Sequence, residues 1–282
     1  MVYGSQLKEF IMENFFQKNM KNKAKKLNGV LEKGSKFTKL NKLNSFFFFM
    51  LYIIGLGLGK RGISDEGLEI AKRCKKIYLE NYTVDFPYET KKIEEVVGKK
   101  ISLADRNFVE GLKFIDEAKK MDVALLIYGS PLTATTHITI LQEAKASGIK
   151  CKVIFSASIL DAVAETGLQI YKFGKIASMP KFEADSFMEI IKDNQKINAH
   201  SLILIDIGLE LQDALKKLKD ALEKYKIKIN KIIVGQCLGT KYSKVFYDSI
   251  ENLGSLKVRK PYCIIIPEKL HFVEEEYLEL LK

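Results

Sequence analysis

The chain has no tryptophan, only three histidines and few cysteines, and these scarcities limit its chemistry. Its four cysteines are far apart in sequence, without Cys-x-x-Cys spacing and without a neighbouring histidine: Cys74, Cys151, Cys237 and Cys263. This pattern disfavours a metal centre or a disulfide framework and favours free, buried thiols in a reducing cytoplasm. We therefore expect no metal and a cytoplasmic location.

Long hydrophobic runs are also missing. The longest, residues 46–54, has about half the length needed to cross a bilayer. The basic stretch before it is too long for a signal peptide, and no small-residue cleavage site follows it. The sequence therefore predicts no membrane span.

Positive charge is concentrated at one end of the chain. The net charge of the 282 residues is +11, and residues 1–49, with ten lysines and three glutamates, contribute seven of these charges. The basic character is thus no evidence that the folded part binds nucleic acid directly. We predict that residues 1–49 are a basic, flexible extension. Two interpretations of it stay open: an arm for a membrane surface or partner, and the favoured one, a dispensable extension before a domain that begins at Met50.

Beyond the extension, strand-like and helix-like patterns alternate. Residues 50–54 are apolar without alternation, which is typical of a strand covered on both faces of a parallel sheet. Glycines at 55, 57 and 59 follow, and Ser64 is a candidate N-cap for the next helix. Such a strand-turn-helix unit indicates a ligand site at the end of the strand, where glycines let the backbone approach a ligand. The Gly-x-Gly-x-Gly spacing makes a nicotinamide dehydrogenase a weak alternative.

A second strand-to-turn unit lies at residues 122–137, where an apolar strand runs into Gly-Ser-Pro-Leu-Thr-Ala-Thr-Thr-His. Hydroxyl groups and backbone amides in this turn can hold a polar ligand. A strand at 152–155 then leads to Ser158, the candidate N-cap of a helix over 159–165. A domain boundary near residue 156 gives two α/β domains, 50–155 and 156–282.

The remaining patterns complete this alternation. We predict further strands at 75–80, 201–207 (ending beside an acid), 231–236 and 262–267, and further helices at 90–97, 110–120, 138–146, 186–197, 211–225 and 273–281.

Four segments, in order, resemble the diphthine synthase family of the tetrapyrrole methylase superfamily: residues 50–58, 129–137, 158–175 and 266–274. The resemblance spans residues 50–282. It implies an S-adenosylmethionine-dependent methyltransferase that methylates the amino group of a modified histidine, the diphthamide precursor, on translation elongation factor 2. It also implies two α/β domains with the cofactor in the cleft between them, and a homodimer.

Carried over position by position, the resemblance implies cofactor contacts at Leu58, Ser130, Thr133, Ser158, Ile159, Ile205, Leu238 and His271. Ser130 stands where the family usually has aspartate. A serine hydroxyl can still accept a hydrogen bond from a ribose hydroxyl, but without assistance from a charge.

Methyl transfer to an amine requires in-line orientation and an unprotonated nitrogen. His271 is the candidate base because the pKa of histidine is near neutrality, although it can equally bind the cofactor or cap its turn. We expect His137 to pack or cap a helix and His200 to lie on the surface. Lys172 and Lys175 are candidates for attracting a substrate carboxylate.

Two alternatives stay open besides the elongation factor methyltransferase. One is a related methyltransferase of the same superfamily that acts on ribosomal RNA or a tetrapyrrole; the Thr-Thr-His and Lys-Leu-His segments argue against it. The other is a non-catalytic domain of the same fold, which only Ser130 favours.

Overall fold

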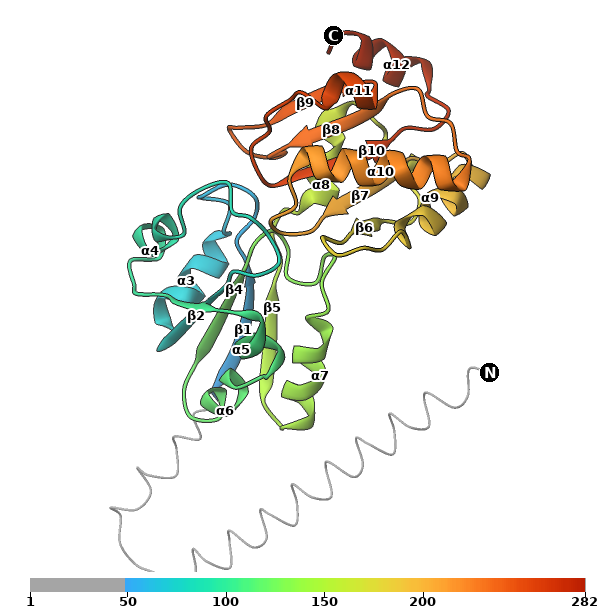
Figure 1. Cartoon of the computed structure of the whole chain (residues 1–282). Helices are drawn as coiled ribbons and strands as arrows, with labels where there is room; N and C mark the ends of the chain where they lie inside the picture. The colour runs from blue at the N-terminus through green and yellow to red at the C-terminus, as the bar shows by residue number, and fades with distance from the viewer. Residues whose placement is uncertain (1–48, 282) are drawn as a thin grey trace, which may run out of the picture. The chain divides into compact units, whose positions relative to one another are not determined.

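Two five-stranded sheets organise residues 49–281, the part of the chain that the computed structural model describes (Figure 1). The predicted N-terminal extension lies, apart from its last residue, outside these described residues. The predicted domain boundary near residue 156 stays a prediction; it falls just after the last strand of the first sheet.

The first sheet is entirely parallel. Its strands are β1 (Met50–Gly55), β2 (Lys76–Glu80), β3 (Ser102–Ala104), β4 (Val123–Ile127) and β5 (Lys150–Ile154), in the order β3-β2-β4-β1-β5. In the central pair β1 and β4, Leu51 lies opposite Val123, and every residue of β4 is buried. The continuous apolar runs therefore predicted a doubly covered parallel sheet correctly.

Helices cover both faces of this sheet. They are α3 (Asp65–Arg73) and α4 (Lys91–Val97) on one face, and α5 (Arg106–Glu110), α6 (Phe114–Ala118) and α7 (Ile138–Ala146) on the other. The Ser64 hydroxyl accepts a hydrogen bond from the Gly67 N–H at 3.1 Å, which confirms the predicted N-cap. The prediction of one helix over 110–120 is wrong: Leu112 has φ 55°, in the left-handed region, where a helix cannot continue.

The second sheet is mixed, with both parallel and antiparallel neighbours. Its strands are β6 (Ala177–Met179), β7 (Ser201–Ile205), β8 (Ile232–Gln236), β9 (Lys244–Asp248) and β10 (Tyr262–Ile266), in the order β6-β7-β10-β8-β9. Strand β10 runs antiparallel to both β7 and β8. An apolar run such as 262–266 reads the same in either direction, so the sequence pattern could not reveal this reversal.

The helices of the second half are α8 (Ile159–Ala162), α9 (Phe187–Lys196), α10 (Leu211–Tyr225), α11 (Ile250–Leu253) and α12 (Phe272–Glu279). Helices α9 and α10 pack their apolar faces on one side of the sheet, whereas α8 and α12 contribute to the core on its other side. Short 3₁₀ turns at Val163–Thr166 and Ile170–Lys172 connect α8 to β6.

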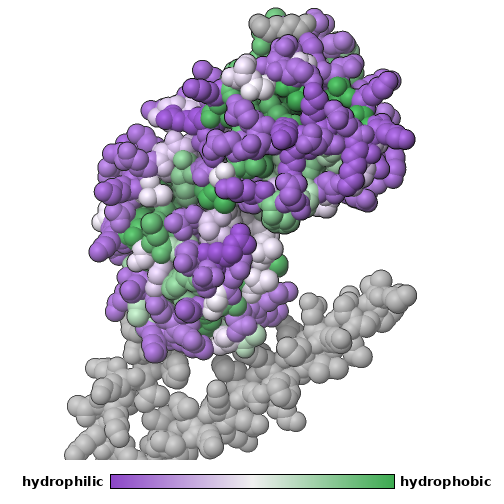
Figure 2. All heavy atoms as spheres, viewed as in Figure 1, coloured by the Kyte–Doolittle hydropathy of each residue, from purple (hydrophilic) through white to green (hydrophobic). Residues whose placement is uncertain are grey.

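Hydrophilic residues dominate the face shown in Figure 2, with patches of hydrophobic residues between them. Within residues 49–281, no helix is both long and apolar enough to cross a membrane. All four cysteines are free, and Cys151 alone is only half-buried.

Candidate functional site

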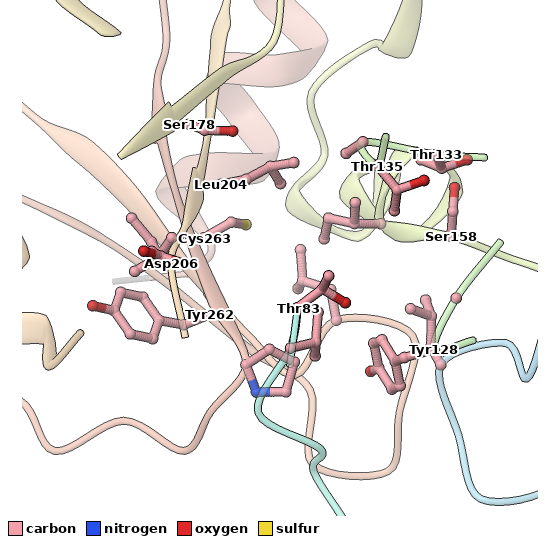
Figure 3. Close-up of a pocket in the computed structure, with 18 of the residues that line it drawn as sticks. Thr83, Tyr128, Thr133, Thr135, Ser158, Ser178, Leu204, Asp206, Tyr262 and Cys263 are labelled. Carbon is pink, nitrogen blue, oxygen red and sulfur yellow. The ribbon is translucent and has the colours of Figure 1, made fainter. Parts of the chain in front are cut away.

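A cavity of about 380 Å³ lies where the loops of the two sheets meet (Figure 3). Seven of the eight residues at which the resemblance implies cofactor contacts line it: Leu58, Ser130, Thr133, Ser158, Ile159, Ile205 and Leu238. The eighth, His271, does not. Residues from both sheets, far apart in the sequence, thus line one cavity.

Parallel strands explain the first wall of the cavity. Leu58, Ser130 and Ser158 follow β1, β4 and β5, which are neighbours in the sheet. Because parallel strands end at the same edge, the loops after them converge. The second wall includes Ile205 at the end of β7 and Leu238 after β8.

The glycine turn after β1 packs directly against the turn after β4. The backbones of Gly57 and Gly129 bond each other in both directions, at 3.1 and 3.0 Å. Gly57 has φ 63°, and a Cβ there would lie 2.6 Å from the Gly62 carbonyl oxygen. Of residues 55–59 only Leu58 lines the cavity. Glycine at position 57 therefore lets the two turns pack together, and a role of this turn in holding a ligand stays a prediction.

Ser158 caps a helix at the edge of the cavity. Its hydroxyl accepts from the Leu160 N–H at 3.2 Å and donates to Asp161 at 3.0 Å, in a capping box that opens α8. The predicted N-cap is confirmed. Most of the bonding capacity of this hydroxyl is used within the protein, so the cap mainly fixes the loop that lines the cavity.

Tyr128 carries the one buried side-chain nitrogen or oxygen atom without a hydrogen-bond partner among residues 49–281. It lines the cavity (Figure 3), and its ring packs against Phe86 and Tyr88, with centroids 5.2 and 6.5 Å away. Burial raises the pKa of Tyr128, so its hydroxyl keeps its proton at neutral pH. An unpaired buried hydroxyl costs about 1–3 kcal/mol, and a ligand in the cavity can supply the missing partner.

Glu80 shapes a further part of the wall that the sequence did not reveal. This buried carboxylate at the end of β2 accepts from the Thr83 hydroxyl at 2.7 Å, and from the N–H groups of Tyr82 and Thr83, both at 2.9 Å. Since Thr83 donates its hydrogen to Glu80, its lone pairs are left to accept a bond from a ligand in the cavity. The sequence signal that could have indicated this role is an acidic residue at the end of an apolar strand.

His271 lies at the opposite edge of the second sheet. Pro261, Tyr262 and Cys263, at the start of β10, line the cavity, whereas His271 follows the end of that strand. A five-residue strand spans about 15 Å. The imidazole caps α12, with Nδ1 accepting from the Val273 N–H at 3.4 Å. The reversed direction of β10 thus separates His271 from the other seven residues.

His200 is fully buried, so the prediction of a surface residue is wrong. Its Nδ1 accepts from the Glu268 N–H at 2.9 Å, and its Nε2 lies 3.3 Å from Glu274. Desolvation lowers the pKa of His200. The ring is therefore a neutral tautomer that donates through Nε2. His137 is buried against the Pro131 carbonyl oxygen, at 3.2 Å, as a packing residue.

Lys172 and Lys175 do not line the cavity. Lys172 forms an ion pair with buried Glu274, and Lys175 bonds Asp193 at 2.9 Å. The position of both lysines disagrees with a role in drawing a substrate carboxylate into the cavity. No group of three His, Cys, Asp or Glu side chains in the described part of the chain could hold a metal ion.

Three comparisons with known proteins agree on the family of this chain. A model of tetrapyrrole (corrin/porphyrin) methylases matches residues 50–254. The chain is 39% identical over 253 residues to a diphthine synthase of Methanocaldococcus jannaschii, covering 82% of this chain and 98% of that protein. It is 41% identical over 170 residues to the diphthine methyl ester synthase of Schizosaccharomyces pombe, covering 58% of this chain and 60% of that protein. A crystal structure of a diphthine synthase has a TM-score of 0.77 and 32% identity, covering 82% and 95% of the two chains.

Proposed function

Because the chain belongs to the diphthine synthase family of the tetrapyrrole methylases, we propose that it methylates the amino group of the modified histidine, the diphthamide precursor, on translation elongation factor 2, with S-adenosylmethionine as the donor. The chain is a methyltransferase with a mixed α/β fold. The observation that carries the proposal is the single cavity in which seven of the implied cofactor contacts meet.

The residues of the cavity fit this cofactor. Leu58, Ile205 and Leu238 supply apolar contact area, and Ser130 and Thr133 supply hydroxyl groups. The unpartnered hydroxyl of Tyr128 indicates that the cavity is built around a polar ligand. When bound, S-adenosylmethionine supplies a methyl group attached to a positively charged sulfur.

The main task of the protein is then to orient the accepting nitrogen and keep water out, an effect of several kcal/mol. The nitrogen must also lose a proton before it attacks. No histidine lines the cavity among the described residues. Thr83 lines the cavity, and since its hydroxyl donates to Glu80, its oxygen can accept a hydrogen bond from the amine.

The proposal includes the partners and the location. Elongation factor 2 is the protein substrate, the enzyme is a homodimer, and both act in the cytoplasm. The two domains are residues 50–155 and 156–282, after the extension 1–49. The names of the relatives favour this function over a methyltransferase for ribosomal RNA or a tetrapyrrole.

The test is mass spectrometry of elongation factor 2 that carries the precursor, after incubation with the protein and labelled S-adenosylmethionine. We expect mass gains in steps of one methyl group. Ser130→Phe places a ring in the cavity and should abolish the gain, whereas Ser255→Phe, at an exposed position, should not. An unmodified factor despite tight cofactor binding would indicate another substrate, and no binding at millimolar cofactor would indicate a non-catalytic domain.

A further inference from the structure

The cavity contains one cationic and one acidic side chain. Among the described residues that line it, Arg106 is the only Lys, Arg or His, and Asp206 is the only Asp or Glu. They come from different sheets: Arg106 opens α5 just after β3, and Asp206 directly follows β7. One charge of each sign thus faces the same space from two walls.

Arg106 has bonding capacity to spare. Its guanidinium lies over the Tyr82 ring, 5.0 Å from the centroid, and its Nη1 bonds Glu110 at 3.3 Å. That ion pair is exposed on both sides, and such pairs hold their partners weakly. No other hydrogen bond from the guanidinium to a described residue is present, although it carries five N–H donors. It can therefore take a carboxylate.

The platform beneath Arg106 is fixed from inside the fold. Buried Glu80 accepts the Tyr82 N–H at 2.9 Å and so holds the turn that carries the ring. A planar guanidinium that rests on an anchored aromatic ring presents its donors in a restricted set of directions. This arrangement suits recognition of a carboxylate better than a freely moving lysine would.

Asp206 is a half-buried carboxylate without a cationic partner. Its Oδ1 accepts from the Ile207 N–H at 3.0 Å, and its Oδ2 from the Lys181 N–H at 3.2 Å. Within residues 49–281, no Lys, Arg or His nitrogen lies within 4.0 Å of it. Each oxygen keeps lone pairs that an ammonium group can use.

We propose that Arg106 and Asp206 together bind a ligand that carries both a carboxylate and an ammonium group, with the carboxylate at Arg106 and the ammonium at Asp206. A ligand with only one charge would leave one of these two side chains without a ligand group of opposite charge. This inference rests on the proposed function, which offers two sources of this chemistry: the amino-acid tail of S-adenosylmethionine, and an amino-acid-like group on the modified histidine of the protein substrate.

Titration calorimetry of the full chain separates the two sources. The probes are S-adenosylmethionine and 5′-methylthioadenosine, which lacks the amino-acid tail, and the variants are Arg106→Gln and Asp206→Asn. If the tail of the cofactor is bound, both variants weaken the affinity for S-adenosylmethionine about 10- to 100-fold and leave that for methylthioadenosine unchanged. If the protein substrate is bound, the cofactor Kd stays constant in calorimetry. The KM for the elongation factor, from the methyl-transfer reaction, then rises by a similar factor in both variants.

Matched controls exist for both residues. Arg73 also lies over a tyrosine ring, 5.5 Å from the centroid of Tyr52, and Asp248 also accepts from the N–H of the next residue, at 2.7 Å. Neither lines the cavity, so Arg73→Gln and Asp248→Asn should change none of these constants. Thermal unfolding of each variant verifies that it is folded.

Either cavity variant matching its control on every ligand would overturn the inference. So would a split in which the two variants weaken different ligands, because the proposal assigns both charges to one ligand. A wild-type protein that binds neither nucleoside would contradict the proposed function and the inference with it. Wild-type binding together with unaffected variants would contradict the inference alone.

Discussion

The two edges of the second sheet, at opposite ends of its strands, differ in how far their polar groups are paired. At the edge that faces the cavity, Asp206 has no cationic partner among the described residues, and the Tyr128 hydroxyl from the first half has no hydrogen-bond partner among them. At the far edge, the Glu274 carboxylate accepts from Lys172, from His200 and from two backbone N–H groups. The difference indicates a ligand site at one edge and a structural cluster at the other. We call this cluster, Glu274 with its four donors, the clasp.

The clasp joins segments that are distant in the sequence. The two N–H donors belong to Gln169, at 2.8 Å, and His271, at 2.7 Å, so that one carboxylate holds the start of α12 and the loop before β6. Burial alone would raise the pKa of Glu274, but these bonds and that of Lys172 outweigh burial and lower the pKa to about 2. The carboxylate is therefore ionised throughout the physiological range.

The largest expected effect is on stability at the far edge. Glu274→Gln should lower the free energy of unfolding by about 3 kcal/mol, because the mostly buried Lys172 ammonium loses its counter-ion and the new amide group faces donors. Urea denaturation measures this loss. Glu95→Gln, in the exposed pair with Lys92, should cost less than about 0.5 kcal/mol. A loss as small as that of the control would refute the clasp.

The same carboxylate should make stability depend on pH. The folded pKa of about 2 lies below the unfolded value of about 4.3, so the stabilisation is complete above pH 4.3 and disappears as the pH falls through 2. Two pKa units correspond to about 3 kcal/mol. Denaturation between pH 5 and 2 should show a steeper decline for the wild type than for Glu274→Gln. Equal slopes for the two proteins would contradict this account.

Two N-caps allow a paired test of the edges. Ser158 and His271 each open a helix with a capping box, the first beside the cavity and the second at the clasp. Replacement of either by alanine should cost about 1 kcal/mol of stability. Calorimetry should find weaker S-adenosylmethionine binding for Ser158→Ala only, with the His271→Ala Kd within about twofold of wild type. A large loss of affinity for His271→Ala would restore it as a cofactor contact.

The smallest change removes one oxygen atom. Tyr128→Phe should leave the free energy of unfolding unchanged or slightly higher, and should weaken cofactor binding about fivefold, because the hydroxyl has no hydrogen-bond partner within residues 49–281. In Tyr78→Phe, loss of the bond to Glu117 at 2.8 Å should lower stability instead and leave binding intact. If the two variants behave alike, the Tyr128 hydroxyl does not contact a ligand.

The first sheet was predictable from the sequence because its strands are parallel and doubly buried. Continuous apolar runs at 50–54 and 123–128 identified the strands, and their shared direction placed the loops with Ser130 and Ser158 at one edge. The second sheet was not predictable, because the apolar pattern of β10 is the same for a parallel and for an antiparallel strand. That reversal places His271 at the end of the second sheet that lies away from the cavity.

Other features were missed for local reasons. Strand β3 has three residues, of which Ser102 and Leu103 are exposed, so no apolar run preceded Arg106. The patterns of 110–120 suggested one helix and hid the break at Leu112. His200 was misjudged because a polar residue before a strand is usually exposed, whereas the distant Glu268 N–H and Glu274 carboxylate satisfy its two ring nitrogens in the interior.

A crystal structure of the protein with S-adenosylmethionine bound tests the central claim most directly. The account predicts the ligand between the two sheets, in contact with Leu58, Ser130, Thr133 and Ile205, with Tyr128 bonded through its hydroxyl and His271 still capping α12. Density for the ligand at the far edge, against His271 and away from those residues, would contradict it.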